Sequence, residues 1–388
     1  MAVPIRSLSS GKQWVCPVFI LALLTLGYSR EAQGQTRTWT SEMPDSSGRA
    51  TSLVADNDGN VHISYSDDRA NVKYGFRSVT DGHWYTMTIG TTGAISTTIK
   101  VDSQGDPHIC YTSRKLKYAF LDKKKWQTQD IGTDTSPAQF TCSLAISPDG
   151  TPHVAWYKDQ NPDGSIFAHL RFARLQDGVW LVRTLDFDAQ TGKWSSMTIG
   201  RDGNPYVSYD AFVKGDIKVA HWDGKAWHFQ IIDSRGIGRE GQYNIGMGNS
   251  IALDSQGLVH VSYFTESQLR YAHPKENGWA VETVERVNPL SGWASFRSSI
   301  ALDRKGRPHI CYEDAGVVKL ASWDGSRWQI QLISERGQEQ LRYSSITIDA
   351  NDTIYVAYRD ADDRSLKVAV GRLAATPQTA AAGPESKP

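Results

Sequence analysis

Histidine recurs at one position of this sequence, and histidine is the side chain that most often acts as a metal ligand or as a general base near neutral pH. Each copy opens a short segment that reads His, then Ile or Val, then a small residue and, in most copies, Tyr. The five are His62, His108, His153, His260 and His309, with Tyr206 and Tyr355 at the same position in two other copies. One histidine per repeat cannot converge on a single ion once the repeats are spread around a ring. We therefore expect buried, structural histidines whose ring nitrogens bond to backbone or turn groups.

No other motif points to a metal, a phosphate or an activated nucleophile. The sequence has no G-x-S-x-G, no H-E-x-x-H and no phosphate-cradling glycine loop. Turns such as residues 56–59 faintly resemble calcium loops, but they lack the glutamate of the twelfth position. We expect no metal and no cofactor. Whether the chain is an enzyme stays open, and a catalytic site would have to use Tyr or Glu with Arg and His169.

Cysteine gives no metal site either. Cys110 and Cys311 share one repeat position, which other copies fill with Ser64, Ala155, Ser208, Ser262 and Ala357. Cys142 is the third cysteine beyond the N-terminal leader, and no C-x-x-C spacing occurs. We interpret all three as structural.

Charge and the N-terminus limit the class of protein. Lys+Arg and Asp+Glu are both 42, so the basic excess of a nucleic-acid-binding protein is missing. Residues 1–34 have the pattern of an export signal, with Arg6 and Lys12 before an apolar run at 15–26 and Ala32 and Gly34 near the expected cleavage point. We expect a secreted or periplasmic protein with no stable membrane insertion, a retained N-terminal anchor being the alternative.

The elements that position these residues come from an internal repeat. Its clearest copy spans residues 250–285, and each copy contains four strand-like segments joined by short turns. The copies start at Ser52, Thr98, Ser143, Ser196, Ser250, Ser299 and Ser345, at intervals of 45–54 residues. Four antiparallel strands per copy make one propeller blade. We predict an all-β, seven-bladed β-propeller of four-stranded antiparallel blades over residues 35–373.

The last copy predicts how the ring closes. It ends after its third strand, at residues 366–370, and the tail 374–388 has the composition of a disordered segment. Residues 38–42 match the Trp-led fourth strands of other copies. We predict that this N-terminal strand completes blade seven and protects the sheet edges.

Two further recurring residue types are interpreted as scaffold. Every third strand carries a basic residue, which is expected to pack its stem and reach solvent or an acidic partner. The residues are Lys73, Lys117, Arg171, Lys218, Arg270, Lys319 and Lys367. The tryptophans at the turns between third and fourth strands are expected to pack between blades.

The irregular loops join second to third strands and lead into the next blade, so they share one face of the disk, here called the variable face. Binding residues concentrate on loops displayed by a rigid scaffold, which makes this face the expected functional surface. Acidic residues follow the second strands there, at Asp67, Asp159, Asp210, Glu266, Asp314 and Asp360. The predicted ligand-binding residues are Trp194, Arg239, Glu240, Tyr243, Trp293, Arg297, Arg342 and Tyr343.

The repeat SIALD-x-x-G-x-P-H-I-x-Y followed by LKYA resembles those of secreted bacterial seven-bladed propellers, a group loosely related to sialidase-like propellers. The resemblance covers residues 36–373. It implies the fold more than a function, since such propellers include lectins, lyases, hydrolases and interaction platforms. The sialidase box S-x-D-x-G-x-x-W is missing, so that activity is not inferred.

Three functions follow as hypotheses. The first is a non-catalytic module that binds a glycan or another extracellular ligand on the variable face. The second is a polysaccharide-active enzyme of the lyase type with a Tyr/Arg site in the central depression. The third is a scaffold for protein–protein interaction.

Overall fold

The computed structural model describes residues 37–374, apart from 92, 95, 114, 133–141, 159–168, 189, 235–244, 288–296 and 336–343. These residues lie within one compact unit, Gly34–Pro388. The leader and most of the tail fall outside them. Over the described part of the chain every regular element is a strand. No helix in that part has the length and apolar character needed to span a bilayer.

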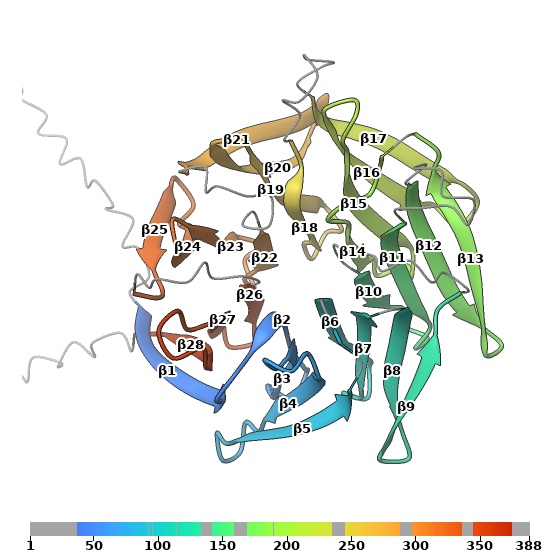
Figure 1. Cartoon of the computed structure of the whole chain (residues 1–388). Coiled ribbons are helices and arrows are strands. Elements are labelled where there is room, and N and C mark those ends of the chain that lie inside the picture. Colours follow the sequence, from blue (N-terminus) through green and yellow to red (C-terminus); the bar gives the residue numbers. More distant parts are fainter. Residues whose placement is uncertain are drawn as a thin grey trace, which may run out of the picture. The chain divides into compact units, whose positions relative to one another are not determined.

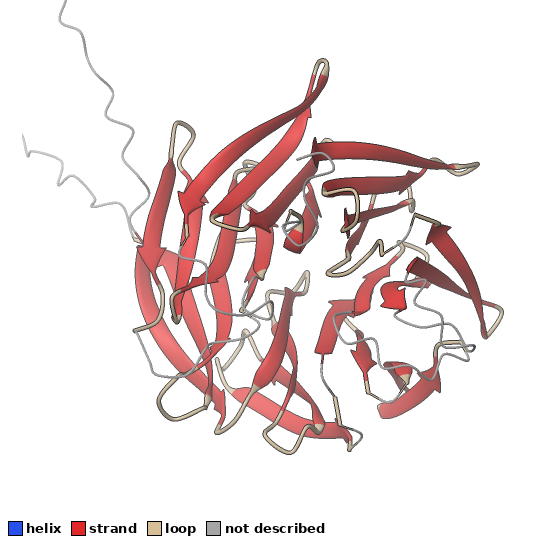
Figure 2. Cartoon of the chain, turned by 45° about the horizontal axis from the view of Figure 1, so that its top comes forward, coloured by secondary structure: helices blue, strands red, loops and turns tan. Residues whose placement is uncertain are grey.

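The strands form seven antiparallel sheets of four strands each, arranged as the predicted propeller around a central axis (Figures 1 and 2). In blades one to six the strands follow sequence order from the axis outward, whereas in blade seven the outermost strand is β1. Blades one to four are β2 (Arg49–Ala55), β3 (Val61–Ser66), β4 (Val72–Arg77), β5 (Trp84–Gly90); β6 (Ser96–Val101), β7 (Pro107–Thr112), β8 (Leu116–Asp122), β9 (Lys125–Asp130); β10 (Cys142–Ile146), β11 (Pro152–Lys158), β12 (His169–Gln176), β13 (Val179–Asp186); and β14 (Ser196–Ile199), β15 (Pro205–Ala211), β16 (Asp216–Trp222), β17 (Trp227–Ser234). Blades five to seven are β18 (Met247–Leu253), β19 (Val259–Thr265), β20 (Gln268–Lys275), β21 (Gly278–Arg286); β22 (Ser298–Leu302), β23 (Pro308–Asp314), β24 (Val317–Trp323), β25 (Trp328–Leu332); and β26 (Ser345–Ile348), β27 (Ile354–Arg359), β28 (Leu366–Leu373), β1 (Arg37–Asp45).

The N-terminal strand closes the ring as predicted. β1 pairs antiparallel with β28, with Thr40 opposite Val370, and lies on the outer edge of blade seven (Figure 1). Trp39 lies opposite Gly371, where an added Cβ would come within 2.6 Å of the indole. The match of this tryptophan to a glycine fixes the register of the closing strand.

Hydrophobic packing lies between blades rather than within them. The buried apolar side chains form seven clusters, one for each junction between neighbouring blades. One fourth-strand tryptophan packs on each cluster, as predicted: Trp39, Trp84, Trp126, Trp180, Trp227, Trp279 and Trp328. A blade therefore buries its faces only by stacking on both neighbours, which is why the sheet stack must close.

The recurring histidines are structural, as expected. In blade one, His62 is buried, with Nε2 at 3.1 Å from Oδ2 of the turn residue Asp56 and Nδ1 at 2.8 Å from the Tyr74 hydroxyl. Burial lowers the pKa of His62, and the Asp56 carboxylate partly opposes this. His108 and His260 make the same bond to Tyr118 and Tyr271, whereas His153 and His309 bond to Ser147 and Ser322.

Six of the seven basic residues of the third strands pair with a carboxylate, whereas among the described residues Arg171 donates to the Thr184 hydroxyl. In blade one, Asp45 accepts from Lys73 Nζ at 2.5 Å and from the Tyr65 hydroxyl at 2.6 Å. Since Asp45 ends β1 of blade seven, this set joins the last blade to the first. The same arrangement joins blades three to four, four to five and five to six through Asp186, Asp233 and Glu285.

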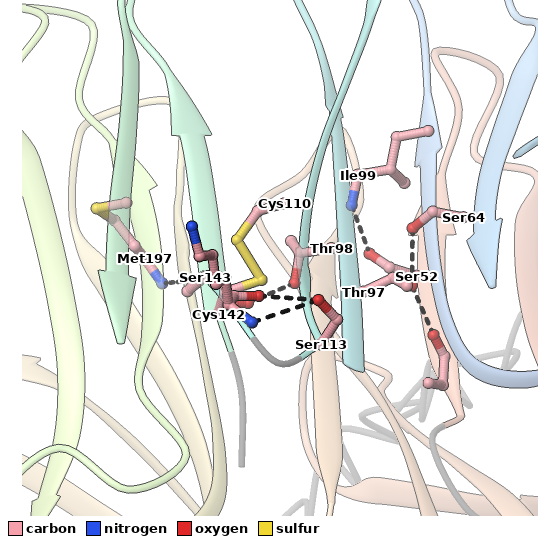
Figure 3. The surroundings of a disulfide bond; sticks show 12 residues. Ser52, Ser64, Thr97, Thr98, Ile99, Cys110, Ser113, Cys142, Ser143 and Met197 are labelled. Carbon is pink, nitrogen blue, oxygen red and sulfur yellow. Dashed lines mark hydrogen bonds between the residues drawn. A yellow bond between two sulfur atoms is a disulfide. The ribbon is translucent and has the colours of Figure 1, made fainter. Parts of the chain in front are cut away.

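Two of the three cysteines are joined, which the sequence interpretation did not predict. Cys110 of β7 and Cys142 of β10 form a disulfide between blades two and three, with Cα atoms 6.2 Å apart (Figure 3). Ser64 and Thr97, at the equivalent positions of the preceding junction, form a hydrogen bond of 3.0 Å. The disulfide is thus the covalent form of a polar contact that recurs between blades. Cys311 is buried and free.

Candidate functional site

A cavity of about 190 Å³ lies at the centre of the ring and is lined by the first strand of every blade. Apart from Lys100, near the C-terminal end of β6, its lining residues come from the N-terminal or central parts of these strands and from the residues just before them, so it opens towards the variable face. Small-molecule sites usually measure roughly 300–1,000 Å³. The described part of the cavity therefore fits the end of a ligand rather than an oligosaccharide.

The wall of this cavity is held by one serine or threonine per blade, here called the first-strand hydroxyl. In six junctions its oxygen accepts a hydrogen bond from a backbone amide of a neighbouring first strand; at the seventh, Thr98 donates to the Cys142 carbonyl (Figure 3). The accepting pairs are Ser345 with Leu53, Ser52 with Ile99, Ser143 with Met197, Ser196 with Ile251, Ser250 with Ile300 and Ser299 with Ile346, at 2.7–3.3 Å. This belt explains why the repeat begins with a small hydroxyl residue.

Two residues before the first-strand hydroxyl is a position that differs from blade to blade. It holds Ala50, Ser96, Trp194, Gly248 and Arg297 among the described residues. Trp194 has a φ of 46°, a left-handed conformation that is uncommon for a large side chain. The structure places Trp194 and Arg297, two of the predicted ligand-binding residues, in the wall of the same cavity.

Trp194 is more deeply packed than a ligand platform requires. Only 4% of it is exposed, and it packs in the cluster of Met247 and Phe264 at the junction of blades five and six. Arg297 is half-buried. The other predicted residues, Arg239, Glu240, Tyr243, Trp293, Arg342 and Tyr343, lie outside the described residues.

The acidic residues after the second strands do not form a common site. Asp67 accepts from the Arg69 and Asn71 amides and Asp360 from those of Asp362 and Asp363, as turn caps. Asp314 pairs with Lys319 at 2.7 Å. Asp159 lies outside the described residues. Their common spacing reflects turn chemistry, not convergence on a ligand.

Asp210 is the exception. It is fully buried, and neither carboxylate oxygen has a side-chain hydrogen-bond partner among the described residues, although the backbone amides of Gly192 and Lys193 lie nearby. Burial raises its pKa well above the usual range, although the nearby Lys193 charge opposes this.

Asp210 also marks a repeat position that sequence reasoning missed. Four residues after the recurring histidine, the seven blades carry seven different residues, all buried: Ser66, Thr112, Tyr157, Asp210, Phe264, Glu313 and Arg359. The residue directly before it is nearly constant, being tyrosine in six blades and tryptophan in the remaining one. A buried position that never repeats inside a regular repeat is the signal that could have found it.

The opposite face carries two other grooves. The larger, about 610 Å³, lies between blades three and four and includes His153, Arg174 and Arg201. His153 Nε2 and Ser147 Oγ form a hydrogen bond of 2.6 Å, and burial lowers the pKa of His153 to about 4. Three aspartates, Asp149, Asp177 and Asp202, line the same groove, so its charges are mixed. These residues belong to the uniform turns of the repeat, which makes the central cavity the stronger candidate.

Acid–base chemistry finds little support in the described residues. The second-strand tyrosines Tyr65, Tyr209, Tyr263 and Tyr312 are buried beside carboxylates, which raises their pKa values. A tyrosine that acts as a base needs a lowered pKa. No cluster of three or more metal-ligating side chains occurs within the described ranges.

No protein family matches the chain by its sequence pattern, and no curated protein matches it. Several solved structures share its fold. One is Aleuria aurantia lectin in a complex with Fucα1-6GlcNAc. The alignment spans 75% of this chain and 97% of the lectin chain, with 13% sequence identity and a TM-score of 0.53. That lectin is described as a six-bladed propeller.

Two further solved structures resemble the chain. The alignment with AofleA from Arthrobotrys oligospora spans 78% of this chain and 91% of the AofleA chain, with 14% sequence identity and a TM-score of 0.51. The alignment with the polysaccharide lyase Uly1 spans 84% of this chain and 90% of the Uly1 chain, with 10% sequence identity and a TM-score of 0.53. At these identities the likeness concerns the propeller fold alone.

Proposed function

We propose that this protein is a non-catalytic propeller that binds a glycan at the central cavity of the variable face. The observation that carries the proposal is the cavity itself. All seven blades contribute small polar side chains to it, and Trp194 and Arg297 stand at its variable position. Hydroxyl and amide groups with an arginine are suited to directional hydrogen bonds with sugar hydroxyls. The lectin and lyase neighbours support a carbohydrate ligand, and a protein partner remains the alternative.

A lyase is the less favoured function. It needs a base at the sugar ring, and the second-strand tyrosines have raised pKa values. Incubation with uronic-acid polysaccharides would release unsaturated products that absorb in the ultraviolet. Such products would replace the binding proposal with an enzymatic one.

Export and the relation to sialidase-like propellers are also proposals. The basic and apolar pattern of residues 1–34 supports export. The disulfide Cys110–Cys142 fits it, because disulfides persist in oxidising compartments.

A glycan array followed by calorimetry tests the main proposal. With the best array ligand, Arg297→Ala should weaken binding about 10- to 100-fold, the range of an interface hot spot. Arg327→Ala is the matched control, since the Arg327 side chain is 77% exposed on the opposite face. Trp194→Ala is a poor test because this tryptophan fills a core cluster.

If Arg297→Ala binds like the parent, the ligand does not use this cavity. If no glycan binds at all, the proposal is wrong and the interaction scaffold takes its place.

A further inference from the structure

The central cavity is unusual in its charge. Its described lining includes two basic residues, Lys100 and Arg297, and no aspartate or glutamate. Most of the remaining lining consists of serine, threonine and asparagine. The whole chain has equal numbers of acidic and basic residues, 42 of each, whereas the described lining of this cavity has a net positive charge.

Lys100 differs in type from the residues at the equivalent position of the other six blades. It stands two residues after the first-strand hydroxyl, at a position with small or aliphatic residues in every other blade: Val54, Ala145, Thr198, Ala252, Ala301 and Thr347. Nothing in the scaffold calls for a lysine there, because six blades fold without one. The fold therefore gives no structural reason for this charge.

Lys100 is also unpaired within the described part of the chain. It makes no hydrogen bond or ion pair there, whereas third-strand basic residues such as Lys73 and Lys218 bond to carboxylates. Lys100 is half-buried, and this burial lowers its pKa with no charged neighbour contributing. An ammonium group that loses water without gaining a counter-charge destabilises the folded protein. An anion in the cavity would reverse that cost.

Ser195 provides a second unpaired group in the same wall. It is 4% exposed, and its Oγ has no partner among the described residues. Equivalent residues bond to the preceding blade, as Thr97 does to Ser64 and Asn249 to Ser208. Ala155 occupies the matching position before Ser195 and cannot bond to it. The Ser195 hydroxyl therefore keeps an unused hydrogen-bonding capacity in the wall of the cavity.

From these observations we infer that the cavity binds the anionic group of an acidic glycan, with Lys100 as its counter-charge and Ser195 as a hydrogen-bond donor. This inference rests on the proposed glycan-binding function and narrows it to charged sugars. The anion is a carboxylate of a uronic acid or a sulfate ester, and both have oxygens that accept charge-assisted hydrogen bonds. The volume of about 190 Å³ admits one charged sugar end rather than a chain.

Calorimetry on the full mature chain with three tetrasaccharides tests the inference: a neutral one, a galacturonate and a sulfated one. The parent should prefer one charged ligand over the neutral one, and which charged ligand binds tells carboxylate from sulfate. Lys100→Met, which keeps length and removes charge, should weaken that binding at least tenfold. Lys225→Met, an exposed turn residue on the opposite face, should leave it unchanged.

A thermal shift gives a readout that does not depend on a glycan array. Free galacturonate or sulfate should raise the melting temperature of the parent and not that of Lys100→Met. Without ligand, Lys100→Met should melt at the parent temperature or above, because a desolvated charge is removed.

The outcomes separate the two proposals. Equal binding of neutral and charged ligands, or unchanged charged-ligand binding by Lys100→Met, overturns the anion site and leaves glycan binding standing. Absence of binding to all three tetrasaccharides and of any thermal shift overturns the anion site. Failure of the whole glycan array overturns the proposed function as well.

Discussion

Asp210 shows how one residue can oppose the stability of an otherwise regular blade. Its carboxyl group is buried without a side-chain hydrogen-bond partner in the described residues, and burial raises its pKa. The folded state therefore holds a proton that the unfolded chain releases above its ordinary pKa, near 3.8. Stability must fall as the pH rises from that value through the raised one.

Asp210→Asn should raise stability at pH 7 by about 1–3 kcal/mol, since it removes a buried charge. The gain should shrink as the pH is lowered towards 4, where the parent carboxyl is protonated too. Thermal unfolding of both proteins at several pH values measures this. Asp314→Asn is the control with the opposite sign, because Asp314 is ion-paired with Lys319. A less stable Asp210→Asn variant at pH 7 would mean that the carboxylate has a partner in the native protein.

At the scale of elements, five of the seven junctions repeat one contact between a second strand and the residue that precedes the first-strand hydroxyl of the next blade. The contact is a disulfide between blades two and three, whereas Cys311 Sγ lies 3.7 Å from the Ser344 Oγ between blades six and seven. The two pairs occupy the same repeat positions. The second junction can therefore accept the geometry of the first.

Ser344→Cys should form a second inter-blade disulfide with Cys311. It would close a loop of 33 residues, which the chain-entropy description equates with about 4 kcal/mol. Burial raises the pKa of the Cys311 thiol to about 12, so the bond should form during oxidative refolding rather than in the folded protein. Peptide mapping without reductant detects the bond. The melting temperature should rise only when no reductant is present. A variant that keeps both thiols after oxidative refolding would show that these strands are too far apart.

At the scale of the whole molecule, the buried histidines make the ring sensitive to acid. Burial lowers the pKa of His62, His108, His260 and His309, and that of His153 to about 4. Below pH ~6.5 the unfolded chain binds protons at these sites while the folded chain does not. The contribution of these neutral histidines to the free energy of unfolding is therefore complete above that pH. It is lost as the pH falls from there towards the lowered pKa values.

The melting temperature should fall steadily between about pH 6.5 and 4, as measured by scanning calorimetry. His153→Gln should flatten part of this dependence, because it removes a histidine whose pKa is lowered to about 4. His83→Gln should not alter it, since the His83 side chain is 76% exposed. A melting temperature that stays constant over this range would contradict the assignment of neutral, buried histidines.

The sequence by itself determined the architecture, because local periodicity encodes it. The repeat length, the D-x-x-G turns and the displaced Trp-led strand at residues 38–42 predict seven blades closed by β1, and the structure has them. The scaffold roles of the histidines, third-strand basic residues and tryptophans followed from their regular recurrence.

Only the tertiary structure decided which positions of one blade meet which positions of the next. That register pairs Cys110 with Cys142, leaves Ser195 opposite Ala155, and brings Lys100 into one cavity with Arg297 and Trp194. These residues are far apart in sequence and share no local pattern, because their contacts arise when the ring closes. The long loops that hold Tyr243, Trp293 and Arg342 have no periodicity from which a position could be derived.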